Sequence, residues 1–260
     1  MCTSVFMIST LGRAKKTHAV SVYTETIEYN HGGVVLEGFV AYDEADKRVR
    51  PGVLVMHEWW GINKYILGRV KQLAELGYVA FAADIYGKGN RAKTREEAMA
   101  LASRFRGTDR TLLRARANAS LAVLLKNPIV DPKRIAAIGY CFGGTAALEL
   151  ARSGANIAGV VSFHGGLDTP RPADAKDIRA KVLVLTGADD QAAAPQQVLS
   201  FQNEMKVGGV DWYLVTYANA IHGFTNPDNG TDTSKNVAYN EKADKRSWRA
   251  MLDFFGEIFS

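Results

Sequence analysis

The sequence predicts an α/β fold in which helices flank both faces of a mostly parallel β-sheet, without a large lid domain. Short apolar runs typical of buried strands alternate with helical patterns along the 260 residues. No internal repeat, low-complexity tract or long linker interrupts this alternation. A length of 260 residues and a hydrophobic fraction of 47% are sufficient for one well-buried core. These observations favour strands joined by helical crossovers.

The predicted elements follow one another in a regular order. Residues 20–29 and 34–41 are expected to form an opening antiparallel hairpin. Core strands are expected at the short apolar runs 52–57, 78–83, 134–140, 157–164, 181–186 and 212–217. Helical patterns lie near residues 64–76, 94–106, 110–126, 143–153, 195–207 and 236–258.

Residues 1–20 differ from the rest of the chain. They contain Arg13, Lys15 and Lys16 without a balancing acid, and they lack the apolar centre and small-residue cleavage site of a secretory signal. We expect a leader or disordered N-terminal extension, with a transit-like peptide as the alternative. Residues 21–260 are expected to form a single α/β domain.

Composition narrows the classes of partner. Without the three leader cations the formal net charge falls from +5 to +2, and no basic stripe with interleaved aromatic residues suggests nucleic-acid binding. No apolar run approaches the roughly 18 residues needed to span a bilayer. Cys2 and Cys141 lie in contexts too different to suggest a disulfide, which favours a reducing compartment. We therefore expect a cytoplasmic monomer that binds neither nucleic acid nor membrane.

The segment Gly139-Tyr-Cys-Phe-Gly-Gly144 places Cys141 in a G-x-C-x-G turn between an apolar strand and a helix that begins with small residues. Glycine at 139 and 143 lets two backbone segments cross closely, while the side chain of residue 141 points out of the turn. A buried structural cysteine is the alternative interpretation. The glycine spacing favours a nucleophile instead.

Further reactive side chains follow three other predicted core strands, at the edge where ligands bind in open parallel sheets. Glu58 follows the first core strand, Asp189 and Asp190 follow the fifth, and His222 follows the last. The chain order nucleophile, acid, histidine is that of the α/β-hydrolase fold. Asp190 is the predicted acid because of the G-x-x-D spacing, although the adjacent aspartates also suit a turn.

The other histidines are expected to play no direct part. His18 lies in the leader and His31 in the hairpin turn. His57 is expected to shape its loop. His164 is expected at a strand end with no nucleophile beside it. His222 is therefore the predicted catalytic base, with an ordinary loop histidine as the alternative.

Residues 22–258 resemble the dienelactone hydrolase family of the α/β-hydrolase fold. The resemblance is carried by H-E-W-W-G at 57–61, A-D-I-Y-G at 83–87, G-Y-C-F-G-G at 139–144, G-A-D-D at 187–190 and H-G-F at 222–224. It implies a Cys-His-Asp triad of Cys141, His222 and Asp190. Cysteine in the turn and glutamate in the first loop separate this family from serine esterases of the same fold.

The resemblance also implies supporting groups around the triad. In that family a glutamate such as Glu58 lies near the resting thiol and takes part in its activation. If Glu58 lies beside Cys141, its negative charge disfavours a permanent thiolate and so limits oxidation between turnovers. A surface carboxylate is the alternative interpretation of Glu58. The backbone N–H groups of Trp59 and Phe142 are implied as the oxyanion hole, which stabilises negative charge on the substrate oxygen.

The sequence departs from the family where the substrate binds. Family members acting on dienelactone hold its carboxylate with arginines, but the stretch after the histidine ends in Asn226. Arg95 loosely matches a second arginine, with a solvated helix charge as the alternative, and Met99 and Ala102 replace aromatic residues. We therefore expect a roomier pocket with less preference for anions, near Trp60, Tyr86, Arg95, Phe224 and Asn226.

These observations predict a metal-independent hydrolase of carboxylic esters or lactones that forms a covalent thioester. No H-E-x-x-H, paired C-x-x-C or histidine cluster suggests a metal, and no G-x-G-x-x-G pattern suggests a cofactor. Hydrolysis of activated phosphotriesters through a thiophosphoryl intermediate is the enzymatic alternative. A redox-sensing thiol protein is the non-enzymatic one, although a sensor needs neither the acid nor the histidine.

Overall fold

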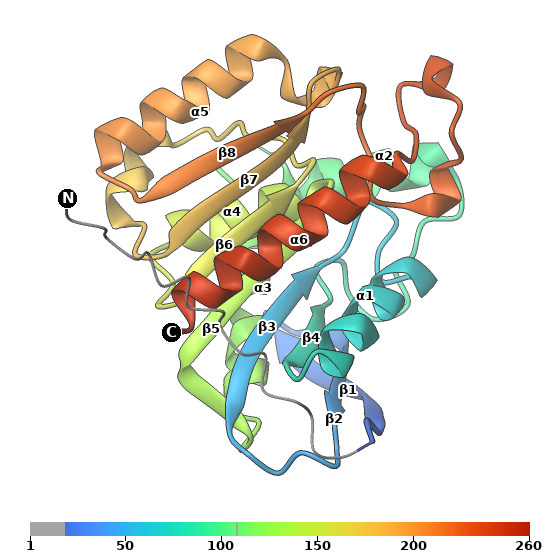
Figure 1. Cartoon of the computed structure of the whole chain (residues 1–260), viewed down its shortest axis with the longest axis vertical. Helices are drawn as coiled ribbons and strands as arrows, with labels where there is room; N and C mark the ends of the chain where they lie inside the picture. The colour runs from blue at the N-terminus through green and yellow to red at the C-terminus, as the bar shows by residue number, and fades with distance from the viewer. Residues whose placement is uncertain (1–18, 108) are drawn as a thin grey trace, which may run out of the picture.

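The computed structural model describes residues 19–107 and 109–260, within which eight strands form one sheet in the order β1-β2-β4-β3-β5-β6-β7-β8 (Figure 1). β1 pairs with β2, and β2 with β4, in antiparallel fashion, and all the other pairs are parallel. The strands are β1 (Val22–His31), β2 (Val34–Asp43), β3 (Arg50–Met56), β4 (Val79–Ala83), β5 (Val130–Tyr140), β6 (Gly159–Phe163), β7 (Lys181–Gly187) and β8 (Trp212–Tyr217). The predicted opening hairpin and six core strands are confirmed.

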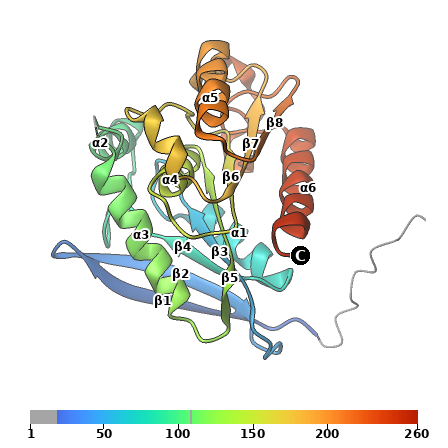
Figure 2. The same ribbon diagram turned by 90° about the vertical axis from the view of Figure 1, so that its left-hand side faces the viewer.

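The predicted helices are also confirmed, and they cover both faces of the sheet. Figure 2 shows α1 and α6 on one side and α3 and α4 on the other. The helices are α1 (Lys64–Glu75), α2 (Arg95–Phe105), α3 (Thr111–Leu125), α4 (Phe142–Arg152), α5 (Pro195–Gly208) and α6 (Glu241–Ile258). Four short 3₁₀ helices are described as well: η1 (Pro172–Asp177), η2 (Gln191–Ala193), η3 (Pro227–Asn229) and η4 (Thr233–Lys235).

Local sequence signals explain several helix boundaries. The side chain of Asn63 accepts a hydrogen bond from the backbone N–H of Ile66 at 3.1 Å and so begins α1. Asn240 caps α6 in the same way, so this helix begins at 241 rather than near 236 as the sequence predicted. α5 begins with Pro195 and ends before Gly209, whose φ of 66° suits glycine.

The strands have apolar residues on both faces because helices cover both faces of the sheet. In β3, Leu54 and Met56 belong to the hydrophobic cluster beneath α2, α3, α4 and α5. Val53 and Val55 point the other way, into the cluster beneath α1 and α6. All four side chains are fully buried, and burial of each stabilises the fold by about 1.5–3 kcal/mol. Continuous apolar runs are therefore the signature of these central strands.

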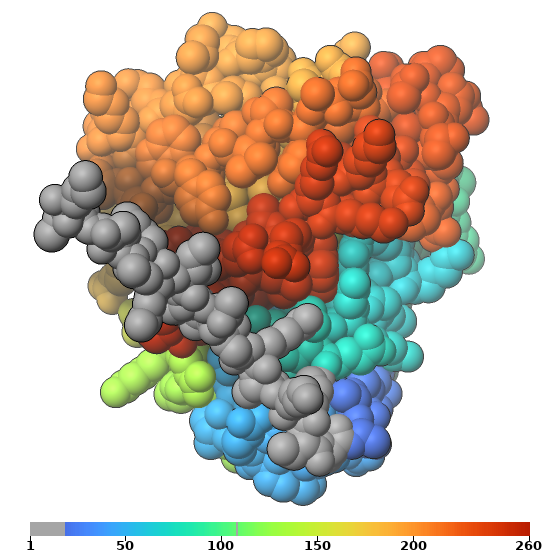
Figure 3. Space-filling model, in the orientation of Figure 1, coloured from blue at the N-terminus to red at the C-terminus, as the bar shows by residue number. Residues whose placement is uncertain are grey.

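α6 occupies the middle of one face of the molecule, between the region of α5 and β8 and the region of α1 (Figure 3). Among the described residues, no helix combines the length and apolar character needed to cross a bilayer. The predicted leader covers residues 1–20, of which 1–18, including Cys2 and His18, lie outside the described residues.

Candidate active site

Cys141 lies in the tight turn between β5 and α4. Its φ of 54° and ψ of −117° are unusual for a residue with a side chain and store about 1–3 kcal/mol of strain. The two flanking glycines make this turn possible. A Cβ on Gly139 would overlap the carbonyl of Gly143, and a Cβ on Gly143 would overlap the carbonyl of Met56. The backbone of residue 141 is thus held by close contacts that only glycine allows.

The three predicted triad side chains lie in hydrogen-bonding contact. Cys141 Sγ is 3.0 Å from His222 Nε2. On the other side of the ring, His222 Nδ1 is 3.0 Å from Asp190 Oδ2 and 3.2 Å from Oδ1. Asp190 is buried and also accepts the backbone N–H of Ala192 at 2.8 Å, which fixes its carboxylate. The arrangement can pass the thiol proton to His222 while Asp190 orients the imidazole.

The surroundings of His222 favour its charged form. Burial alone lowers the pKa of His222, but Cys141 and Asp190 overcome this and raise the pKa well above its ordinary value. Both partners act through charge and through hydrogen bonds to the imidazolium. A raised pKa makes His222 a stronger base toward the proton of the Cys141 thiol.

Glu58 lies in the loop after β3, and only 3% of the residue is exposed. Burial raises the pKa of Glu58 to about 7, against the opposing effects of a hydrogen bond from Asn226 and the charge of His222. Asn226 Nδ2 donates to Glu58 Oε2 at 2.8 Å. Asn226 therefore lies behind Glu58 and holds it in place. No sequence signal predicts that contact.

The raised pKa of Glu58 has a testable effect on stability. The unfolded chain releases this proton near its ordinary pKa of about 4.3, whereas the folded protein keeps it until about pH 7. The folded state is therefore destabilised as pH rises from about 4.3 through 7. We expect Glu58→Gln to raise the free energy of unfolding by about 3 kcal/mol more at pH 8 than at pH 4.

Urea unfolding of both proteins at the two pH values measures this difference. Glu241→Gln, at an exposed position on α6, is the matched control and is expected to show no gain in stability at pH 8. An equal effect of Glu58→Gln at pH 4 and pH 8 would contradict the assigned titration.

A cavity of about 240 Å³ opens beside Cys141 and His222. Trp60 and Arg95, two of the predicted pocket residues, line it, as do Trp59, Phe142 and Glu58. The remaining lining residues are Ala102, Arg106, Cys141, Gly166, Ala192, His222, Gly223, Asn229 and Val237. The residues implied as the oxyanion hole therefore lie at the cavity surface, and Phe142 is in the first turn of α4, where backbone N–H groups have no partner within the helix.

Three predicted pocket residues do not line the cavity. Tyr86 lies behind it, where its hydroxyl donates to the backbone oxygen of Trp59 at 3.1 Å. Phe224 is fully buried and packs against Tyr217 and His164. Asn226 faces Glu58 from behind. All three support the walls of the site.

Arg106 is a cavity residue that sequence reasoning missed. It directly follows the last residue of α2 and lies eleven residues after Arg95, which is close to three helical turns, so both residues lie on the same side of this segment. This spacing is the signal that identifies it. Arg106 shares the carboxylate of Asp168 with Arg110, at 2.7 and 2.6 Å. Arg95 forms no hydrogen bond or ion pair with any described residue, so the cavity contains a cation available to a ligand.

His164 corrects the prediction that no nucleophile lies beside it. Its Nδ1 atom is 3.1 Å from the backbone nitrogen of Cys141. His57 agrees with its predicted role in the loop, since Nδ1 is 2.6 Å from the carbonyl of Glu58 and Nε2 accepts from the N–H of Ile85. Among residues 19–107 and 109–260, no three His, Cys, Asp or Glu side chains are grouped to hold a metal ion.

Comparisons with known proteins identify the chain's relatives. A model of the dienelactone hydrolase family matches residues 36–259. A solved structure described as m3DLH is 40% identical, with a TM-score of 0.88, and the alignment covers 92% of this chain and 99% of that chain. Another, described as a dienelactone hydrolase-like promiscuous phosphotriesterase, P91, from metagenomic libraries, is 36% identical, with a TM-score of 0.85 and coverage of 91% and 98%. A protein of Aquifex aeolicus described as a candidate carboxymethylenebutenolidase is 26% identical over 240 residues, 89% of this chain and 97% of the relative.

Proposed function

The chain belongs to the dienelactone hydrolase family of ester-hydrolysing enzymes, and we propose that it cleaves carboxylic esters or lactones through a thioester on Cys141. The observation that carries this proposal is the 3.0 Å contact between Cys141 Sγ and His222 Nε2, with Asp190 on the far nitrogen. A nucleophile, a base and an orienting acid are the minimum set for such a step.

Acylation begins when His222 takes the proton of the thiol and the sulfur attacks the carbonyl carbon. Charge then develops on the carbonyl oxygen, where the N–H groups of Trp59 and Phe142 are suited to stabilise it. One such donor contributes about 3–4 kcal/mol in comparable sites. As the tetrahedral intermediate collapses, the C–O bond breaks, and His222 returns the proton to the leaving alkoxide.

Deacylation repeats these steps with water. His222 removes a proton from water, the hydroxide attacks the thioester carbon, and the C–S bond breaks to release the acid and restore Cys141. Glu58 lines the same cavity. Its ionised form disfavours a standing thiolate between turnovers because two negative charges would share a partly desolvated site.

The covalent intermediate provides the direct test. During rapid-quench reaction with an excess of a 4-nitrophenyl ester, we expect one acyl group per protein on the peptide containing Cys141, identified by mass spectrometry. Cys141→Ala is the control and should carry none. A turnover-competent wild type with no acyl-cysteine and no burst of 4-nitrophenol would contradict the thioester.

Activated phosphotriesters are a second candidate substrate class. The specific support is the 36% identical relative described as a promiscuous phosphotriesterase. In this reaction Cys141 attacks phosphorus, the aryloxide leaves, and water cleaves the S–P bond of the intermediate. The same backbone donors are suited to the phosphoryl oxygen.

Arg95 predicts that the cavity binds substrates with a negative charge better than uncharged ones. Arg95 lines the cavity and makes no hydrogen bond or ion pair with any described residue, and a charge-assisted hydrogen bond contributes about 1.5–3 kcal/mol. We expect Arg95→Ala to lower kcat/KM for an ester carrying a free carboxylate by about 10-fold or more. An uncharged ester of the same size should change less than about 2-fold. Arg104→Ala, on the same helix but outside the cavity lining, is the control. Equal losses on the two esters would show that Arg95 does not bind the anion.

A further inference from the structure

His164 is a buried histidine that the reaction scheme above does not use. It follows β6, has a φ of 40°, and is 0% exposed. Both ring nitrogens are engaged. Nδ1 is 3.1 Å from the backbone nitrogen of Cys141, and Nε2 is 2.7 Å from Thr225 Oγ1. One side chain thus joins the turn that carries the nucleophile to the loop that follows His222.

These contacts determine which nitrogen of His164 carries the hydrogen. The backbone N–H of Cys141 is only a donor, so Nδ1 must present a lone pair, and the ring must be neutral with its hydrogen on Nε2. Nε2–H then donates to Thr225 Oγ1. The N–H of Cys141 is also 3.0 Å from the carbonyl of Phe163, so it is shared between two acceptors.

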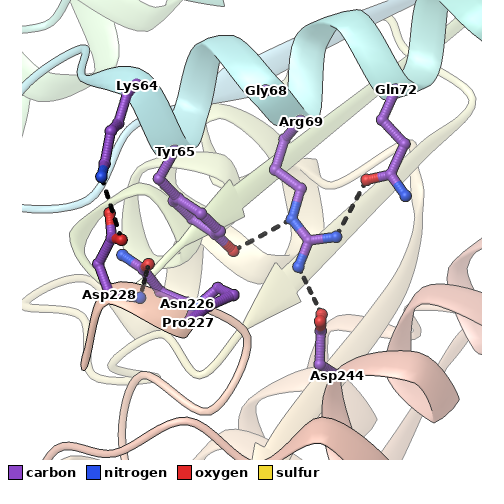
Figure 4. A pocket seen from close by; sticks show the side chains of 9 residues that line it. All are labelled: Lys64, Tyr65, Gly68, Arg69, Gln72, Asn226, Pro227, Asp228 and Asp244. Atoms are coloured by element: carbon purple, nitrogen blue, oxygen red, sulfur yellow. Dashed lines mark hydrogen bonds and ion pairs between the residues drawn. The ribbon is translucent and has the colours of Figure 1, made fainter. Parts of the chain in front are cut away.

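Beyond Thr225, the hydrogen bonds continue to two helices on the opposite face of the sheet from α4. Thr225 Oγ1 is 2.7 Å from the hydroxyl of Tyr65 on α1. Arg69, one turn later, donates from Nε to that hydroxyl at 3.3 Å and from Nη2 to the carbonyl of Thr225 at 2.9 Å. Arg69 also forms an ion pair with Asp244 on α6 (Figure 4).

A cavity of about 380 Å³, separate from the one beside Cys141, exposes the outer end of this chain of hydrogen bonds. Figure 4 shows Tyr65 and Arg69 projecting from α1 toward Asp244 and the loop that contains Asn226. Lys64 lines the same cavity but pairs with Asp228 and takes no part in the chain. A substitution of Lys64 therefore changes this surface without breaking the chain of hydrogen bonds.

His164 also packs against the catalytic base. The rings of His164 and His222 meet edge to face, with centroids 5.4 Å apart. Burial, followed by the charges of His222 and Arg69, holds the pKa of His164 well below its ordinary value. Tyr140 and Phe224 pack around the remaining ring surface. A neutral ring at this position supports His222 without repelling its imidazolium form.

We propose that His164 is a positioning residue that holds the backbone N–H of Cys141 and supports the ring of His222, anchored through Thr225 and Tyr65. This inference rests on the proposed role of Cys141 as nucleophile. The strained backbone of Cys141 needs such external restraint, since strained conformations persist only where surrounding contacts maintain them. Phe142, whose N–H is assigned to the oxyanion hole, is the next residue, so the same restraint orients both groups.

Two substitutions at His164 distinguish its contact with Cys141 from its contact with Thr225. The side-chain oxygen of Asn occupies roughly the position of Nδ1, and Asn tolerates a positive φ, so His164→Asn keeps an acceptor for the N–H of Cys141. Gln reaches toward Thr225 but leaves no acceptor beside Cys141. We expect His164→Gln to lower kcat for a neutral ester by about 10–100-fold with KM within about 3-fold, whereas His164→Asn retains at least about a third of kcat.

The pH dependence of Cys141 alkylation by iodoacetamide provides a readout that lost packing alone does not move. We expect its midpoint to shift in His164→Gln and in Thr225→Val, which removes the hydroxyl but keeps the side-chain volume. Thr225 does not have the positive φ of Cys141 and His164. Thr225→Val therefore tests the chain of hydrogen bonds without adding backbone strain. Lys64→Ala, the control from the second cavity, should match the wild type in kcat and in alkylation.

The outcomes are distinguishable. If His164→Gln, His164→Asn and Thr225→Val all leave the alkylation midpoint unchanged, and kcat falls only in proportion to the fraction folded, His164 is a packing residue and the proposal is wrong. If Cys141→Ala keeps full activity, the proposed nucleophile itself is wrong, and that result stands whatever the His164 variants do.

Discussion

Cys141→Ala is expected to lower kcat/KM for neutral aryl esters and lactones by at least about 10³-fold. Alanine removes the atom that forms the thioester, and the oxyanion donors and the cavity alone recover only a small part of the rate. The same loss is expected for aryl phosphotriesters if both reactions use the thiol. Hydrolysis by wild type and variant, each treated with chelator, measures the effect on all three substrate classes.

The pattern of losses separates the candidate functions. A loss on esters alone would assign any phosphotriester hydrolysis to a different group. Equal rates in the two proteins on every substrate would contradict Cys141 as nucleophile. Sensitivity of the thiol to peroxide in a wild type with no hydrolytic turnover would favour the redox-sensing alternative. Unchanged thermal unfolding is the control that the variant retains its fold.

Arg152→Leu is expected to destabilise the protein by about 3–5 kcal/mol, because it leaves the buried carboxylate of Glu204 without its arginine and removes one of the two arginines that contact Glu149. The Arg152 side chain is 0% exposed and contacts Glu204 at 2.7 Å and Glu149 at 3.0 Å. It also donates to the carbonyl of Leu167 at 3.0 Å. These contacts tie α4, which begins directly after Cys141, to α5 and to the loop after β6.

Thermal unfolding measures this effect, and a loss of about 3–5 kcal/mol corresponds to a fall in Tm of roughly 10 °C for a protein of this size. Arg249→Leu, which breaks an exposed pair with Asp253 on α6, is the control and should change stability by less than about 1 kcal/mol. If the two variants have equal Tm values, the buried network contributes no more than a surface pair. Assays at 20 °C then test whether α4 still holds Cys141 in place.

Much of the fold follows from local sequence patterns, because each core strand is a short apolar run and each helix has its own boundary signals. The order of the strands does not follow in this way. β4 lies between β2 and β3, where Ala80 is paired with both Ala41 and Val53. Such neighbours depend on long-range packing rather than on the residues next to them in the chain.

The residues of the site also differ in whether local sequence signals predict them. Cys141 and His222 stand out because a glycine-framed turn and a histidine after the last strand are local signals. His164, Arg106 and Asn226 contact partners that lie 23, 62 and 168 residues away in sequence. The two members of each pair lie too far apart in the sequence to form a local motif. Their roles are therefore known only from the folded structure.

The glycine frame of the turn has an evolutionary consequence. At Gly139 and Gly143 even a methyl group would collide with backbone atoms, so the path of the chain there permits almost no variation. Residue 141 is different, because its side chain extends into the cavity. A lineage with this frame can exchange sulfur for oxygen at one atom and acquire new reactivity without rebuilding the turn. We therefore expect the two glycines to vary little among related proteins, and the atom that residue 141 presents to the cavity to vary more readily.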